Sequence, residues 1–504
     1  QALKSRQFAV TFTLVLAFAW VWSMMGVGII GPGIRYGAEG RQMFAGYYVI
    51  LSFAVLVIVP FGAFRSLAGE REDGTYELLS VTTLRPRQVV SGKLGSATLQ
   101  MVVYFSAVAP CLGFTYMLRG VDAPTIAYVM VVLFLTSLGL SIGGMLVATA
   151  THEKHWQIVL SVALIFGLGW IFFMGCLFVV EELMRNAIPF DDAQFWIANL
   201  ALLTGYLGFF ALFYFTTAAQ LTFASDNRST PLRIVMLIQQ ATFIGWMGWG
   251  FFREGDLEYV YALLIVGGIY WYAMGAFLSG ESGDLSRRVK RQLPQSFLGR
   301  ALFTWFNPGP ATGFLFAVVN LLTIYGLALA ALLVGELAFP NRTRWGFTGN
   351  YNQTLAIFGG LAASYVVVYL GLGRLLIALV RKFAPVSLPA GVLLQFLLVL
   401  AGTGVPLTIH LMTPGMRESY SPIETTNPFW TLREVSHAGA IDDDTIWALF
   451  VVPLSAVALL LANLPAVVAA VRHVRIAKPM RVAEEDALVE LQRAPPPVPI
   501  NPFE

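Results

Sequence analysis

Residues 126–150 read Ile-Ala-Tyr-Val-Met-Val-Val-Leu-Phe-Leu-Thr-Ser-Leu-Gly-Leu-Ser-Ile-Gly-Gly-Met-Leu-Val-Ala-Thr-Ala, a run of apolar and small residues without a charged side chain. A helix needs roughly 20 predominantly apolar residues to cross a bilayer, whereas a strand of a membrane barrel alternates apolar and polar residues over about ten. Backbone groups must pair internally in lipid, so only helices and closed barrels cross it. This run is too long and too uniformly apolar for a barrel strand, and it therefore predicts a transmembrane helix.

Comparable runs recur along the whole chain of 504 residues, which is 57% hydrophobic and 12% charged. Soluble domains carry about 25% charged residues, so this chain has too little polar surface to coat a soluble fold. We expect an all-α, polytopic integral membrane protein with about twelve transmembrane helices. The first six predicted spans are 8–30, 43–64, 94–118, 126–150, 158–180 and 198–221. The second six are 234–252, 259–278, 313–334, 354–373, 391–412 and 445–471.

Lysine and arginine are unevenly distributed between the loops that connect these spans. With the N-terminus inside and the loops alternating, most of the 32 Lys and Arg residues fall in inside segments. Cytoplasmic loops of membrane proteins carry such an excess. The bias predicts a multi-pass protein of the cell inner (cytoplasmic) membrane with both termini in the cytoplasm. Residues 65–93 and 279–313 would then be cytoplasmic, and the polar loop 413–444 would be external.

The link between the second and third predicted spans, residues 65–93, carries a distinctive pattern. It contains Leu67-Ala-Gly-Glu-Arg-Glu-Asp-Gly-Thr-Tyr-Glu-Leu-Leu79, then Pro86 and then Gly92-Lys93. Glu-Arg-Glu-x-Gly-Thr-x-Glu-Leu-Leu, followed by a Pro and by a Gly-Lys that opens the next helix, resembles the permease subunits of type 2 ABC transporters. The six predicted helices of residues 1–224 agree with that family.

The resemblance implies that this link is a cytoplasmic coupling helix on which a separate P-loop ATPase subunit docks in trans. The chain would then be the membrane-spanning subunit, usually of an exporter. Charged side chains face water, and Leu67, Leu78 and Leu79 can form an apolar stripe on a helix at the membrane interface. On residue types alone, the alternative is a solvated loop flanked by snorkelling arginines. The candidate coupling residues are Glu70, Arg71, Glu72, Asp73, Gly74, Thr75, Glu77, Leu78, Leu79, Pro86 and Lys93.

A shorter copy of the pattern follows the eighth predicted span. Leu278-Ser-Gly-Glu-Ser-Gly-Asp284 matches the start of the first link, and Gly299-Arg300 takes the place of Gly92-Lys93. The matched placement predicts an internal repeat of two six-helix units. Gly-Thr-x-Glu-Leu-Leu is absent from the second copy, which puts its docking role in doubt. The expected domains are a permease-like half at 1–230, a second half at 231–475 and a cytoplasmic tail at 476–504, with a short helix at 483–491 and a partly disordered end.

No catalytic site is expected in this chain. Its Gly92-Lys93 lacks the other P-loop residues, since Leu94 follows and Arg87 stands where a P-loop has its first Gly. ATP hydrolysis is therefore expected only in a partner subunit. His152 and His155 could share a metal, although interfacial histidines are the commoner explanation, and we expect neither a metal nor another cofactor. Cys111 and Cys176 each lie in an apolar run and predict buried thiols rather than a disulfide. The net charge of +3 gives no sign of a nucleic-acid partner.

Two other functions fit the same topology. A twelve-helix secondary transporter would share the span count and the inside termini, and a membrane scaffold would anchor a complex with further membrane subunits. No acidic residue lies in the middle of a predicted span, which counts against proton or sodium coupling. The substrate and the direction of transport stay open. Polar residues within the predicted spans, which serve either a substrate path or hydrogen bonds between helices, are Gln100, Gln239, Gln240, Asn320 and Gln395.

Overall fold

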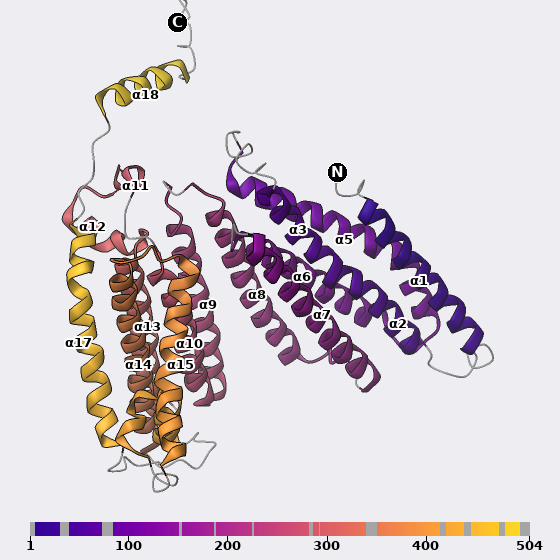
Figure 1. The fold of residues 1–504 in the computed structure, drawn as a ribbon. Helices are drawn as coiled ribbons and strands as arrows, with labels where there is room; N and C mark the ends of the chain where they lie inside the picture. The colour runs from indigo at the N-terminus through magenta and orange to yellow at the C-terminus, as the bar shows by residue number, and fades with distance from the viewer. Residues whose placement is uncertain are drawn as a thin grey trace, which may run out of the picture. The chain divides into compact units, whose positions relative to one another are not determined.

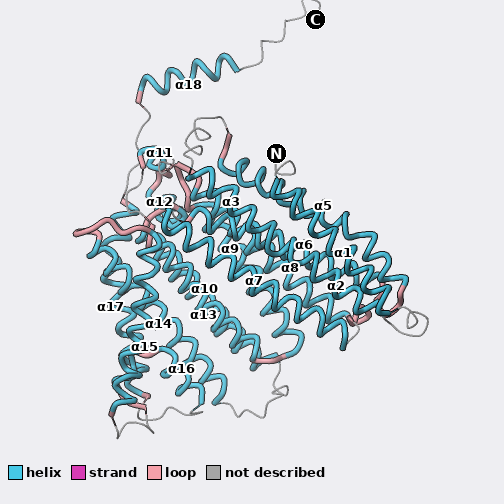
Figure 2. The backbone as a smooth tube through the Cα atoms, turned by 45° about the vertical axis from the view of Figure 1, so that its right-hand side comes forward, coloured by secondary structure: helices cyan, strands magenta, loops and turns pink. Residues whose placement is uncertain are grey.

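The protein is all-helical over the residues that the structure describes (Figures 1 and 2). Twelve of the helices are long and apolar enough to cross a membrane, judged by length and composition. The predicted fold class of a polytopic all-α protein is therefore confirmed. The computed structural model describes residues 6–30, 40–72, 84–150, 154–185, 188–223, 226–281, 286–291, 293–338, 350–413, 420–437, 445–472 and 479–493.

The chain divides into two compact units. The first comprises Gln1–Thr222 with Pro231–Phe243, and the second Phe223–Thr230 with Ile244–Glu504. The boundary predicted between residues 230 and 231 stays a prediction, because α9 (Thr230–Glu254) contributes residues to both units. The other helices of the first unit are α1 (Arg6–Ile30), α2 (Gly40–Phe53), the π-helical turn η3 (Ala54–Ile58), α3 (Val59–Glu72), α5 (Pro86–Met117), α6 (Ala123–Thr149), α7 (Lys154–Arg185) and α8 (Ala193–Gln220).

The second unit contains five further spanning helices, several short ones and a tail helix. The spanning helices are α10 (Glu258–Ser279), α13 (Pro310–Ala338), α14 (Asn350–Val380), α15 (Leu388–Met412) and α17 (Ile446–Val471). The short helices are α11 (Arg287–Arg291), α12 (Phe297–Phe303), η4 (Thr304–Phe306), η5 (Pro422–Thr426) and α16 (Pro428–His437). The tail helix α18 (Met480–Arg493) contains the predicted helix 483–491.

Three departures from the predicted spans matter for function. The third span begins at Pro86 rather than at residue 94, since proline suits a first helical position and the Arg85 N–H donates to Gln88 Oε1 at 2.9 Å. The tenth span continues to Val380 rather than ending at 373, so Arg374 lies inside it. The predicted polar loop 413–444 contains η5 and α16, which its composition did not reveal.

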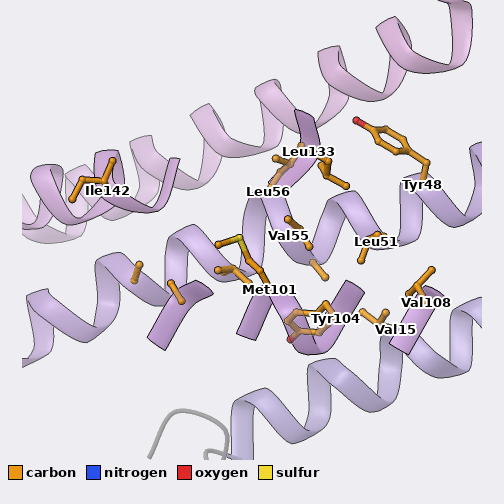
Figure 3. Packing of buried hydrophobic residues seen from close by; sticks show 14 of the residues in the cluster. Val15, Tyr48, Leu51, Val55, Leu56, Met101, Tyr104, Val108, Leu133 and Ile142 are labelled. Carbon is orange, nitrogen blue, oxygen red and sulfur yellow. The ribbon is translucent and has the colours of Figure 1, made fainter. Parts of the chain in front are cut away.

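The core of the first unit forms where α6 packs against the second span. Buried small residues of α6, among them Ser137, Ser141 and Ala148, recur at helical spacing and let the two backbones approach. The Ser137 hydroxyl donates to the Val55 carbonyl O at 2.6 Å, at the π-helical turn where the regular backbone pairing is interrupted. Figure 3 shows part of this cluster around Val55 and Leu56.

The second unit packs α10 closely against α13. Trp271 on α10 is fully buried, with its ring 5.6 Å from that of Phe316 in an edge-on arrangement. At the end of α10, a Cβ on Gly313 of α13 would lie 2.7 Å from the Cβ of Leu278. Only glycine fits this contact without moving one of the helices.

The two units share a pattern of neighbouring helices. In the first, the α2–η3–α3 span packs against α5, α6 and α7, and α6 packs against α5, α7 and α8. In the second, α10 packs against α13, α14 and α15, and α14 packs against α13, α15 and α17. These pairs correspond helix for helix in chain order. The predicted repeat is compatible with this pattern but stays a prediction, because α9 is shared between the units whereas α1 packs against α2 and α5.

The close approach at Gly313 predicts a stability difference between two glycines of α13. Gly313→Ala should destabilise the protein by about 1–3 kcal/mol, as overpacking does in other cores. Gly326→Ala on the same helix is the matched control, since a Cβ there meets no atom within 4 Å. Thermal unfolding of both variants in detergent is the measurement, and equal melting temperatures would contradict the packing.

Candidate functional site

The first link is held between two helix ends. α3 continues through Glu70 to Glu72, and α5 begins at Pro86. Lys93, two turns into α5, places its Nζ 2.8 Å from Glu70 Oε1 and donates to the Ser66 carbonyl O at 2.8 Å. One ammonium group thus ties the end of the second span to the start of the third. The first Glu and the final Lys of the family-like pattern meet in space.

This ion pair is partly shielded from water. The side chain of Lys93 is 15% exposed and that of Glu70 is 33% exposed. Partly exposed pairs contribute modestly to stability, since solvent screens them. The pair therefore fixes the geometry of the two helix ends more than it stabilises the fold.

A second tie holds the start of α5 to α8. The Tyr214 hydroxyl donates to the Arg87 carbonyl O at 3.0 Å, and the Arg87 guanidinium lies 4.8 Å from the centroid of the Phe215 ring. A guanidinium over an aromatic face is attracted to it. The first turn of α5 is thus held both by α3 and by α8.

The structure describes part of the predicted coupling set. Glu70 and Lys93 are paired, Glu72 is exposed, Pro86 opens α5, and the backbone of Arg71 lies in α3. Leu67 is fully buried in the core of the first unit, so it does not belong to an interfacial stripe. The members of the set that lie outside the described residues are Asp73, Gly74, Thr75, Glu77, Leu78 and Leu79.

The described start of the second link is held by several hydrogen bonds. Glu281, which matches Glu70 in the pattern, accepts the Ser229 hydroxyl on Oε1 at 2.6 Å and the Gly309 N–H on Oε2 at 2.8 Å. Arg300, the expected counterpart of Lys93, instead donates to the Gln295 carbonyl O of its own turn. The matching glutamates of the two copies therefore have different described partners: Glu70 pairs with Lys93, and Glu281 accepts from Ser229 and from the Gly309 N–H.

The two residues before Glu281 are also held. Arg381, just beyond α14, donates to the Gly280 carbonyl O at 2.6 Å. Gln395 of α15, one of the predicted intramembrane polar residues, is fully buried and donates to Ser279 Oγ at 3.2 Å. Hydrogen bonding between helices is thus the role that the structure gives to Gln395. Ser279, Gly280 and Glu281 are thus hydrogen-bonded to four other segments, which contribute Gln395, Arg381, Ser229 and Gly309.

Sequence reasoning missed a buried cation next to this network. Arg374 is 6% exposed and its Nε–H donates to Asn463 Oδ1 on α17. The Asn463 amide donates in turn to the Leu459 carbonyl O at 2.6 Å, which orients its oxygen toward the guanidinium. The apolar run around Asn463 was the available signal, since a lone amide in such a run needs a partner.

The histidines and cysteines that the sequence singled out are described only in part. Within the described ranges, no three His, Cys, Asp or Glu residues gather closely enough to hold a metal ion. His155 is exposed at the start of α7, and His152 lies outside the described residues. Cys111 and Cys176 are free, half-buried thiols.

No protein-family model, curated protein or solved structure matches the chain.

The different ties of the two links predict different effects of removing each glutamate. Glu281→Ala leaves the buried Ser229 hydroxyl and Gly309 N–H without this acceptor, which should cost about 1–3 kcal/mol. Glu70→Ala, the matched variant, breaks the partly exposed pair with Lys93, whose loss should cost about 1 kcal/mol or less. Thermal unfolding of the two variants checks this, and a larger loss for Glu70→Ala would overturn the comparison.

Proposed function

We propose that this chain is the membrane-spanning permease subunit of an ABC transporter, and that a separate ATPase subunit drives it by docking at residues 65–93. It works in the inner membrane with both termini in the cytoplasm and carries no ATP-hydrolysing site itself. Export is the direction that the resemblance favours.

The tie between Glu70 and Lys93 is the observation that carries this proposal. Docking of an ATPase on the link can drive transport only if movement of the link is transmitted to the spanning helices. Here the link is joined to the end of the second span and the start of the third by one short ion pair, and α5 is joined to α8. A partner that shifts the link would therefore also move the end of α3 and the start of α5.

A secondary transporter is the second candidate, and Arg374 favours it. Ionisable residues inside spanning helices are rare and commonly mark substrate paths. Arg374 lies in α14 with a neutral amide as its partner, and no carboxylate in the described part of the chain is paired with it. Uptake or efflux by vesicles that contain the chain without any ATPase would favour this candidate.

Charge reversal on the link tests the docking proposal. Glu72→Lys combined with Glu77→Lys alters the link while leaving the Glu70–Lys93 tie intact. Interface anchors typically cost about 2 kcal/mol when removed, equivalent to a roughly thirtyfold loss of affinity. Co-purification of the ATPase subunit and stimulation of its hydrolysis should both fall.

The matched control for this experiment is Glu254→Lys combined with Glu258→Lys. These exposed carboxylates lie at the end of α9 and at the start of α10, and the change in net charge is the same. Normal co-purification is expected there. If the link variant also bound and stimulated the ATPase normally, the docking proposal would be wrong.

Thiol labelling tests the orientation. In a background of Cys111→Ala and Cys176→Ala, single cysteines are placed at two exposed positions by Lys382→Cys and Arg433→Cys. A membrane-impermeant maleimide applied to intact cells should label position 433 and spare position 382. The reverse pattern would invert the topology, and labelling of both would contradict the span count between them.

A further inference from the structure

One end of the second unit is covered by a short folded segment, residues 420–437, which we call the cap. It consists of η5 and α16 and lies at the opposite end of this unit from α11 and α12 (Figure 2). The hydroxyls of Tyr365 and Tyr369 on α14 donate to the carbonyl oxygens of Thr425 and Thr426. The cap is thus hydrogen-bonded to a spanning helix by its backbone.

Beneath the cap lies a buried pair of titratable side chains. His410, near the end of α15, is 4% exposed, and Glu424 of η5 is 0% exposed. Glu424 Oε1 lies directly against His410 Nδ1. The Trp430 ring of α16 covers the imidazole at a centroid distance of 4.6 Å. Opening the cap would expose both groups to water.

The contact between these two atoms requires a proton. Neither His410 Nδ1 nor Glu424 Oε1 has a hydrogen-bond partner elsewhere among the described residues. A carboxylate oxygen and an unprotonated imidazole nitrogen both carry lone pairs and repel each other. A neutral imidazole with its proton on Nδ1 can bond the carboxylate but leaves the pair with a net negative charge, whereas one further proton shared by the pair removes that charge, which a buried site favours.

The other groups that face Glu424 do not remove this requirement. Glu424 Oε2 accepts the Ser421 N–H at 3.3 Å, a long bond. Glu434 on α16 adds a like charge, the Tyr420 hydroxyl is bonded to Thr431, and the Tyr365 and Tyr369 hydroxyls are bonded to backbone. α17, which also packs against η5, has no titratable side chain between residues 446 and 471.

We propose that Glu424 and His410 form a proton-binding site that holds the cap closed, and that loss of their shared proton releases the cap. This site is independent of the transport proposal, since it needs neither an ATPase nor a substrate.

The sign of the pH dependence follows from burial. Burial raises the pKa of Glu424 above its usual range, and it outweighs the opposing effects of the Ser421 N–H and of His410. The closed cap therefore binds the proton more tightly than an open, hydrated cap does. Closure is fully stabilised below the ordinary pKa of a glutamate and weakens as pH rises through the raised pKa. The cap closes in acid and loosens toward alkaline pH.

Hydrogen–deuterium exchange of the purified full-length chain tests the proposal. Exchange of the cap amides is measured by mass spectrometry between about pH 5 and pH 8, a range that covers raised glutamate pKa values. Rates are corrected by those of an unstructured peptide with the sequence of residues 420–437. In the wild type, corrected exchange should accelerate about tenfold for each unit by which closure raises the pKa.

Three variants decide the origin of the effect. Glu424→Gln keeps an N–H donor for His410 and cannot lose it, so its cap should exchange slowly at every pH. Glu434→Gln removes the neighbouring carboxylate and should keep the wild-type pH dependence. His410→Gln keeps an acceptor that does not titrate and should also keep a pH dependence, because Glu424 still carries the proton.

Two results would overturn the proposal. The first is a wild-type cap whose corrected exchange does not change with pH. The second is a Glu424→Gln cap that responds to pH as the wild type does. If Glu424→Gln fails to fold, His410→Gln decides: a pH-independent cap in that variant would exclude Glu424 as the titrating group.

Discussion

A backbone group without a partner inside lipid costs several kcal/mol, and the rest of this structure depends on avoiding that cost. Helices satisfy the requirement within each span, which is why twelve apolar runs become twelve helices. Where a span departs from regular α-helix, a side chain from a neighbour completes the pairing. The Ser137 hydroxyl does so at the π-helical turn of the second span. At the interior Pro406, the Thr426 hydroxyl donates at 3.2 Å to the Gly402 carbonyl O, the group that this proline leaves without a helical partner.

The same constraint explains why the two links are built differently. The first link ends where side chains reach water, so an ammonium and a carboxylate can pair there without the full penalty of burial. The second link begins at a fully buried Ser279, where every polar group needs a partner. Its Glu281 is satisfied by a hydroxyl and a backbone N–H, and its backbone by Arg381. The same short motif thus serves two environments through different partners.

The sequence predicted what depends on local composition. Apolar runs predicted the spans, and Pro86 in a helix-starting context was recognised, although the third span was placed eight residues too late. Features that depend on contacts between residues far apart in the chain could not be predicted from the sequence. The sequence placed Arg374 in a loop, because burying an arginine inside a span costs free energy unless a partner offsets it. The partner is Asn463, which lies 89 residues away in the chain and could not be identified from local sequence. The cap was missed because its helices are short and are stabilised by tyrosines of α14 rather than by an apolar pattern.

Under the proposed function, the strength of each tie decides which half can respond to a partner. The Glu70–Lys93 pair is partly exposed and contributes about 1 kcal/mol or less, comparable with thermal energy. The bonds at Ser279, Gly280 and Glu281 each contribute about 1 kcal/mol, and breaking them together would leave several buried groups unpaired. A docked subunit that shifts the first link would therefore move α3 and α5 while only one weak pair has to adjust, whereas the second link would move only with the helices attached to it. The half that lacks Gly-Thr-x-Glu-Leu-Leu is thus also the half whose link is built into its own fold.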